Sequence, residues 1–142
     1  MIQKVVSCAH AGAQAVGCQI QYDISEGYKE IIPNQVLAGL FKANLELIGR
    51  EVVEPDPNER MGSTDMGDVS HLVPSIHPYI AIAPRNVAGH TLEFKQFCVS
   101  EDGKQGMLDA AKTIALTVFD LCFNPELITK AREELATTLK SL

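Results

Sequence analysis

Apolar residues recur every three or four positions in the first fifty residues, in two stretches that predict helices. The first stretch covers residues 3–16, carries several small residues and is followed by Gly17, a residue that readily ends a helix. The second begins after Asn34, whose side chain suits an N-cap, and ends at Gly49. A charged connection, Arg50–Arg60, follows, and Glu51–Val53 within it could form a short strand.

The C-terminal third shows the same helical spacing over two further stretches. Ser100 is the predicted N-cap of the longest helix, and Asn124 is the predicted N-cap of a last helix that has Pro125 at its first position. The long helix has one wide apolar face, which we expect to pack on the core of the protein. Its members are Met107, Leu108, Ala111, Ile114, Ala115, Val118, Phe119 and Cys122.

Two other stretches follow the two-residue period of strands. Cys18–Ile24 alternates between apolar and polar residues, which is typical of a half-buried strand. Ile76–Ala83 is apolar on both faces, which is typical of an inner strand of a covered sheet. Together the patterns predict an α/β fold in which helices pack on a mixed β-sheet, with the long helix covering one side.

Composition narrows the class of protein. The chain has 142 residues and a net charge of −6 without any basic run, which argues against a nucleic-acid surface. No apolar stretch approaches the roughly 18 residues of a membrane-spanning helix, and the first residues do not suit a signal peptide, so we expect a cytoplasmic protein. The four cysteines, at positions 8, 18, 98 and 122, have no paired spacing, which favours free thiols over a zinc site.

The residues with chemical potential gather between positions 62 and 94. Carboxylates and imidazoles are the usual metal ligands, acids and bases of enzymes, and here they are Asp65, Asp68, His71, His77, His90 and Glu93. Structural roles stay open for each, such as loop capping for the two aspartates and packing for His71 and His77. His90 favours function more strongly because it follows Gly89 at the exit of the predicted inner strand.

Three segments of this region resemble a known family. Residues 62–70 read Gly-Ser-Thr-Asp-Met-Gly-Asp-Val-Ser, residues 73–78 read Val-Pro-Ser-Ile-His-Pro, and residues 89–94 read Gly-His-Thr-Leu-Glu-Phe. They resemble the C-terminal part of zinc-dependent amidohydrolases, the family of aminoacylases and glutamate carboxypeptidases. The closest branch is the aminobenzoyl-glutamate hydrolase and dipeptidase-like group.

The resemblance implies a two-metal site, of zinc or manganese, that cleaves an amide bond in an N-acyl amino acid or dipeptide. It matches His90 to the last metal ligand of the family, and Asp65 and Asp68 to a loop at the rim of the substrate site. It also implies two parts in this chain. Residues 1–24 match the end of an inserted lid domain, and residues 25–142 match the C-terminal part of the catalytic domain.

The chain lacks other features of that family. No histidine is followed two residues later by aspartate, as in the motif that carries the first metal ligands. The only adjacent acidic pairs, Glu101-Asp102 and Glu133-Glu134, lie in predicted helices and do not match the glutamate base, so no catalytic residue is assigned. We therefore expect a C-terminal fragment that is inactive alone and binds no metal stably, so whether this chain is itself an enzyme stays open. The alternative is a stand-alone binding or assembly domain, and in either case exposed apolar faces favour a homo-oligomer.

Overall fold

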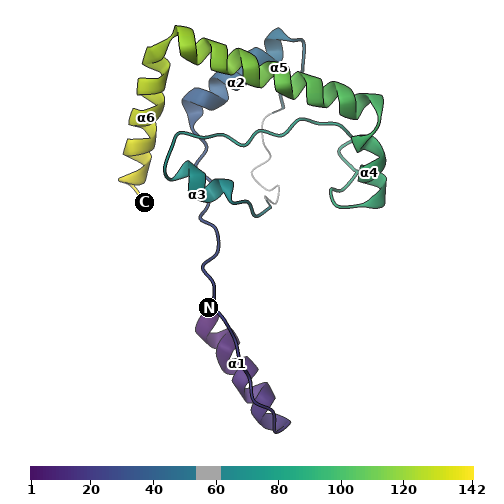
Figure 1. Cartoon of the computed structure of the whole chain (residues 1–142), viewed down its shortest axis with the longest axis vertical. Coiled ribbons are helices and arrows are strands. Elements are labelled where there is room, and N and C mark those ends of the chain that lie inside the picture. Colours follow the sequence, from purple (N-terminus) through teal and green to yellow (C-terminus); the bar gives the residue numbers. More distant parts are fainter. Residues whose placement is uncertain (54–61) are drawn as a thin grey trace.

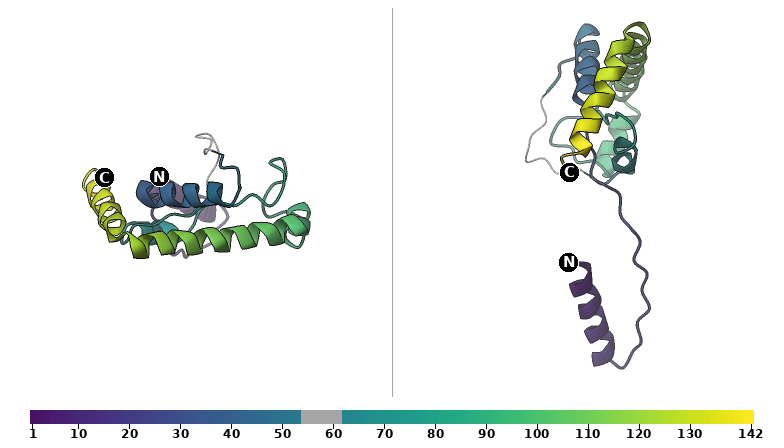
Figure 2. Two further views of the ribbon diagram at one scale, coloured as in Figure 1. Left: turned by 90° about the horizontal axis from the view of Figure 1, so that it is seen from above. Right: turned by 90° about the vertical axis from the view of Figure 1, so that its left-hand side faces the viewer.

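The computed structural model describes residues 1–53 and 62–142, and the regular elements in these ranges are helices (Figure 1). In chain order they are α1 (Ile2–Ala15), α2 (Gln35–Leu47), α3 (Met66–Ser70), α4 (Leu92–Cys98), α5 (Glu101–Phe123) and α6 (Pro125–Leu139). The longest, α5, contacts α2, α4 and α6, so it is the element that joins the body together. Figure 2 shows α2 and α5 side by side, with α6 across one end.

The four predicted helices form. Asn34 and Ser100 cap α2 and α5 as predicted, whereas the side chain of Asn124 makes no capping hydrogen bond to α6. Asn34 accepts a hydrogen bond from Leu37 N at 3.1 Å, and Ser100 Oγ accepts one from Gly103 N at 3.1 Å. Gly17 and Gly49 follow α1 and α2 with φ of 71° and 84°, the left-handed conformation that suits glycine. Local sequence therefore determines where these helices begin and end.

The predicted α/β fold is wrong. No strand or sheet exists among the described residues, and their one β-bridge is an isolated parallel pair between Pro33 and Ser75. Cys18–Ile24, Glu51–Val53 and Ile76–Ala83 lie outside regular structure. The physical reason is that a strand exists only through hydrogen bonds to a neighbour. Helix α5 packs against Ile80 and Ile82 at Gly106, and no second extended segment is paired with them in the described part of the chain.

The sequence pattern missed one short helix, and one expectation lies mostly outside the described residues. The pattern missed α4, where Thr91 Oγ1 accepts a hydrogen bond from Phe94 N at 3.1 Å and caps a helix of only seven residues. So short a helix leaves little periodicity to detect. Of the charged connection Arg50–Arg60, residues 54–60 lie outside the described part of the structure.

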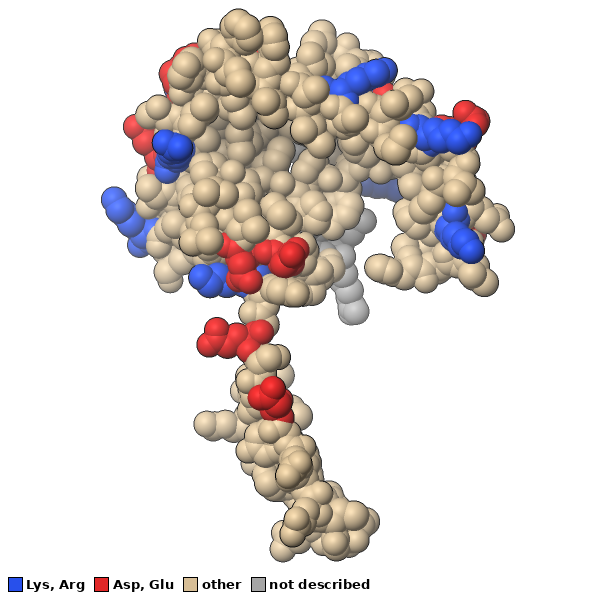
Figure 3. Space-filling view, viewed as in Figure 1, with Lys and Arg blue, Asp and Glu red and all other residues tan. Residues whose placement is uncertain are grey.

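Helix α5 is oriented opposite to the prediction. Its buried positions are small or polar, namely Gly103, Gly106, Asp109, Thr113 and Thr117. Its apolar face points outward, with Ile114, Val118 and Phe119 each more than half exposed. Asn44 of α2 explains this orientation, because its amide donates to Thr117 Oγ1 and Asp120 Oδ2 at 3.3 and 2.8 Å. The contact between α2 and α5 thus contains polar side chains. On the surface, Figure 3 shows little charge over the C-terminal half of α5.

The outward face leads to a stability prediction. The side chains of Ile114 and Phe119 are 56% and 57% exposed, so their replacement by alanine should change the free energy of unfolding by less than about 1 kcal/mol. Phe41→Ala and Leu135→Ala are the matched controls, since both residues are buried, and each should cost about 2–5 kcal/mol. Urea unfolding measures both. A loss above 2 kcal/mol at Ile114 would mean that α5 turns its apolar face inward.

The N-terminal arm, residues 1–28, stands apart from the helical body (Figure 1). Helix α1 contacts none of the other helices and buries no residue, although the rings of His10 and Tyr22 meet edge to face at 5.6 Å. The whole chain exposes 11159 Å², whereas a compact protein of 15.4 kDa exposes about 7,200 Å². The chain therefore leaves about 4,000 Å² more surface exposed than a compact protein of its mass, and the N-terminal arm contributes to this surplus.

Candidate functional site

The second half of the polar loop at residues 62–70 forms α3. Residues of α3 and His71 bind residues 29–32, the segment that leads from the N-terminal arm into the helical body. Ser70 Oγ accepts a hydrogen bond from Ile32 N at 2.9 Å, and Asp68 Oδ1 accepts one from Lys29 N at 3.2 Å. His71 Nε2 lies 3.1 Å from Glu30 O, and because a carbonyl only accepts, the imidazole donates. We call this set of contacts, between residues 67–71 and residues 29–32, the clasp.

The clasp gives Asp68 and His71 structural partners. Asp68 is exposed and uses one carboxylate oxygen on the backbone of the entering chain. Asp65 is also exposed, precedes α3 and receives a weak hydrogen bond of 3.5 Å from Thr64. Their match to a substrate-site rim stays a prediction.

His90 has an unusual backbone. Its φ is 62°, and it is the one non-glycine residue with positive φ in the described ranges. Thr91 fixes the turn, because its hydroxyl donates to Ala88 O at 2.8 Å while it caps α4. The imidazole is exposed and forms no hydrogen bond within the described part of the chain. A strained histidine that contributes nothing to packing is consistent with a functional role.

The candidate residues do not converge. Within the described ranges, no group of three or more histidine, cysteine, aspartate or glutamate side chains is placed to hold a metal ion. Asp65 precedes α3 and Asp68 lies in it, whereas His90 precedes α4, and Figure 1 shows these helices well apart. His77 is exposed and lies 5.4 Å from the ring of Tyr79, and Glu93 lies in the first turn of α4. The described side chains therefore do not by themselves fit a zinc or manganese centre, which needs three or four ligands.

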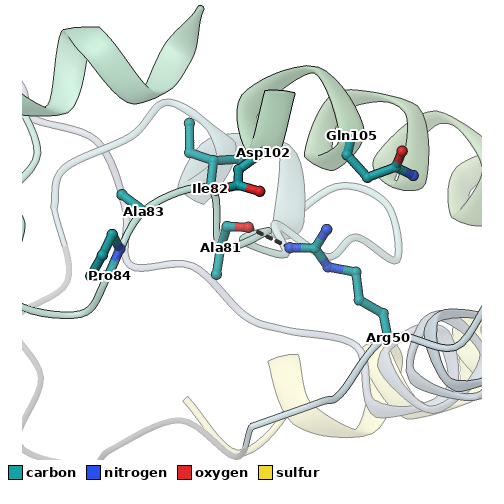
Figure 4. Close-up of a pocket in the computed structure, with 7 residues that line it drawn as sticks. All are labelled: Arg50, Ala81, Ile82, Ala83, Pro84, Asp102 and Gln105. Carbon is teal, nitrogen blue, oxygen red and sulfur yellow. Dashed lines mark hydrogen bonds between the residues drawn. The ribbon is translucent and has the colours of Figure 1, made fainter. Parts of the chain in front are cut away.

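A cavity of about 310 Å³ lies beside α5 and is lined by Arg50, Ala81, Ile82, Ala83, Pro84, Asp102 and Gln105 (Figure 4). Arg50 spans it, donating to Ala81 O and pairing with Asp109 Oδ2 at 2.8 Å. Gln105 donates to the other carboxylate oxygen of Asp109 at 2.7 Å. Because the Arg50 charge is already paired, the cavity offers no cation to an anionic ligand. It is a junction that ties residues 80–82 to α5.

This junction gives a pH prediction. The hydrogen bond from Arg50, followed by that from Gln105, lowers the pKa of Asp109 below its ordinary value. A carboxylate with a lowered folded pKa stabilises the protein above the unfolded pKa of about 3.9, and that stability is lost as the pH falls through the folded value. Asp109→Asn should therefore flatten the acid limb of a plot of unfolding free energy against pH.

The matched control is Asp23→Asn, since Asp23 is exposed in the N-terminal arm and has no partner in the described structure. It should keep the acid limb of the wild type. An unchanged acid limb in Asp109→Asn would show that the Arg50–Asp109 pair is not retained in solution.

Sequence reasoning missed the long-range polar partners that hold the body together. Asp109 and Arg50 are 59 residues apart, and each occupies an ordinary position for a charged residue in the sequence. Glu134 of α6 accepts hydrogen bonds from Gln35 N and Val36 N at 2.6 and 3.1 Å, and so caps α2 from a distance of about a hundred residues. The buried amide of Asn34 donates to Ala131 O at 2.9 Å. The one available signal was Asn44, a polar residue between the buried Phe41 and Leu45 of α2 that bonds to α5.

Comparison with known proteins identifies relatives. The chain is 32% identical over 143 aligned residues to the mouse protein named Xaa-Arg dipeptidase and 33% identical to the human one. Each alignment covers 99% of this chain and 33% of the relative, so the chain spans about a third of the length of the curated relatives it matches. No family model matches the chain.

This chain is related to dipeptidase-like peptidases. The similarity extends over nearly every residue, and it agrees with the hydrolase relationship expected from residues 62–94. It does not single out the aminobenzoyl-glutamate hydrolase branch. Among the described helices, none is long and apolar enough to cross a membrane.

Proposed function

We propose that this chain is the C-terminal portion of a metal-dependent dipeptidase-type amidohydrolase, and that it does not hydrolyse amides alone. The observation that carries the proposal is the alignment of 99% of the chain with only 33% of two dipeptidases. The substrate class is a dipeptide or an N-acyl amino acid. Residues 1–24 correspond to the end of a lid domain, and residues 25–142 to the C-terminal part of a catalytic domain.

The geometry supports this proposal in two ways. The chain leaves about 4,000 Å² more surface exposed than a compact protein of its mass, as expected for part of a larger unit. The candidate ligands are also incomplete, since no three of them converge in the described ranges. We therefore assign to His90 one coordination position of a zinc or manganese site whose other ligands come from outside this chain. Asp65 and Asp68 are assigned to the rim of the substrate site.

A non-catalytic assembly domain is the second candidate function. The specific observation in its favour is the exposed apolar face of α5, since such faces mark interaction surfaces. The homo-oligomer expected from the sequence stays a prediction, as does the cytoplasmic location. Metal content and activity distinguish the two candidates, because an assembly domain needs neither.

The experiment is a chimera. The third of human Xaa-Arg dipeptidase that aligns with this chain is replaced by the chain, and the product is assayed with dipeptides, including Xaa-Arg, in the presence of zinc or manganese. The proposal predicts metal-dependent hydrolysis by the chimera and none by the isolated chain. A folded chimera that binds no metal and cleaves nothing would favour the assembly domain.

A further inference from the structure

The outer face of α5 is an apolar surface without a partner in the described part of the chain. Ile114 is 56% exposed, Val118 53%, Phe119 57% and Phe123 70%. The rings of Phe119 and Phe123 stack at 4.3 Å, and Met107 and Leu108 extend the face toward the N-terminus of the helix. Helix α5 has 23 residues and is therefore about 34 Å long. An exposed apolar face of this length is unusual on the surface of a monomeric soluble protein.

The opposite face of α5 is already occupied. Asn44, Thr117 and Asp120 join it to α2 through hydrogen bonds, and Arg50 joins it to Ala81 through Asp109. Rotating the helix to bury its apolar face would break these contacts and leave buried polar groups unpaired, which is costly. The inner face of α5 therefore stays where it is, and burial of the outer face requires a surface from outside the described chain.

We propose that the outer face of α5 is the docking surface for the part of a dipeptidase-length polypeptide that this chain does not match. This inference rests on the proposed function and names the partner that completes it. The partner must present an apolar surface without charge, because between Thr113 and Asn124 the only charged residue of α5 is Asp120, which bonds to α2.

The size of the exposed surface favours this partner over a second copy of the chain. A standard protein interface buries about 1,600 Å² in total, and half of that comes from each partner. Symmetric pairing through α5 would therefore remove only about 800 Å² from each chain, against a surplus of about 4,000 Å². The unmatched two thirds of the relatives are large enough to cover the rest.

The test compares the same substitutions in two settings. Ile114→Asp and Val118→Asp are made in the isolated chain and in the chimera with human Xaa-Arg dipeptidase, with Leu92→Asp as control. Leu92 is 82% exposed on α4, so the control introduces the same charge at a site more open than Ile114 and Val118. We expect both α5 variants to lower the melting temperature of the chimera by about 5 °C or more. In the isolated chain the loss should be much smaller than in the chimera, about that expected for aspartate in the middle of an exposed helix.

Several outcomes would overturn the proposal. One is an α5 variant that leaves the chimera as stable as the control does, and another is an equal loss in both settings. A chimera that fails to fold with the wild-type α5 face also counts against it. Sedimentation of the isolated chain that shows a dimer, dissociated by Val118→Asp, would assign the face to a second copy. The readout is the melting temperature and does not depend on activity. An inactive chimera whose melting temperature still falls in the α5 variants would refute the catalytic assignment but support the docking surface.

Discussion

Gly67→Ala should destabilise the protein by about 1–3 kcal/mol, because the added methyl group has no room. An ideal Cβ on Gly67 would overlap the carbonyl of Lys29, which is backbone and has no flexible end to move away. The substitution therefore acts on the clasp. Hydrogen exchange should show its position, because the amides of Lys29 and Ile32 donate to Asp68 and Ser70 and should lose protection.

Gly39→Ala is the matched control for this prediction. Gly39 is an exposed residue of α2 with no atom within 4 Å of the added carbon, and it is not part of the clasp. Alanine is a better helix former than glycine, so Gly39→Ala should stabilise the protein by about 0.5–1 kcal/mol. The two substitutions are chemically identical and should have opposite signs. Equal effects would show that residues 29–32 do not dock on α3 in solution.

The helices were predictable from sequence because their causes are local. Asn34, Ser100, Gly17 and Gly49 act on backbone groups within a few residues, so a one-dimensional pattern contains the information. The direction in which α5 faces was not predictable in the same way. It depends on Asn44 of α2 and on Arg50, which lie 73 and 59 residues from their partners. The apolar face of α5 predicted burial, and this was wrong for the described chain, where that face is exposed.

The prediction of a β-sheet was wrong for a related reason. Residues 76–83 have the composition of an inner strand, yet composition records only what environment a segment suits. Strand structure requires paired neighbours, and none is present in the described ranges. For the candidate site, the sequence indicated that residues 62–94 carry the polar residues of interest, but it did not indicate which residues they contact. Asp68 and His71 belong to the clasp, whereas the backbone strain at His90 could be found only in three dimensions.

His90→Ala in the dipeptidase chimera should reduce kcat/KM by about 100-fold or more. The proposal gives this imidazole one coordination position, and a catalytic metal stabilises charge in the transition state by several kcal/mol. The side chain is exposed and makes no hydrogen bond within the described ranges, so its loss should leave the melting temperature of the metal-free chimera unchanged. Metal content, measured on the same samples, should fall with activity.

His77→Ala is the control, since His77 is also exposed and, among the described residues, its ring meets that of Tyr79. It should change kcat/KM by less than about 3-fold, as expected for a surface residue outside the site. A large effect at His77 with none at His90 would move the metal ligand to the other histidine. Equal and small effects at both would remove this chain from the metal site altogether.

The most direct measurement is an activity assay on the isolated 142-residue chain. A panel of dipeptides and N-acyl amino acids is incubated with the wild type and with His90→Ala, with zinc or manganese supplied. Our account predicts no turnover above the rate without protein, because no three ligands converge in the described ranges. Robust, metal-dependent turnover by the wild type, lost in His90→Ala, would contradict it and show that this chain holds a complete catalytic site.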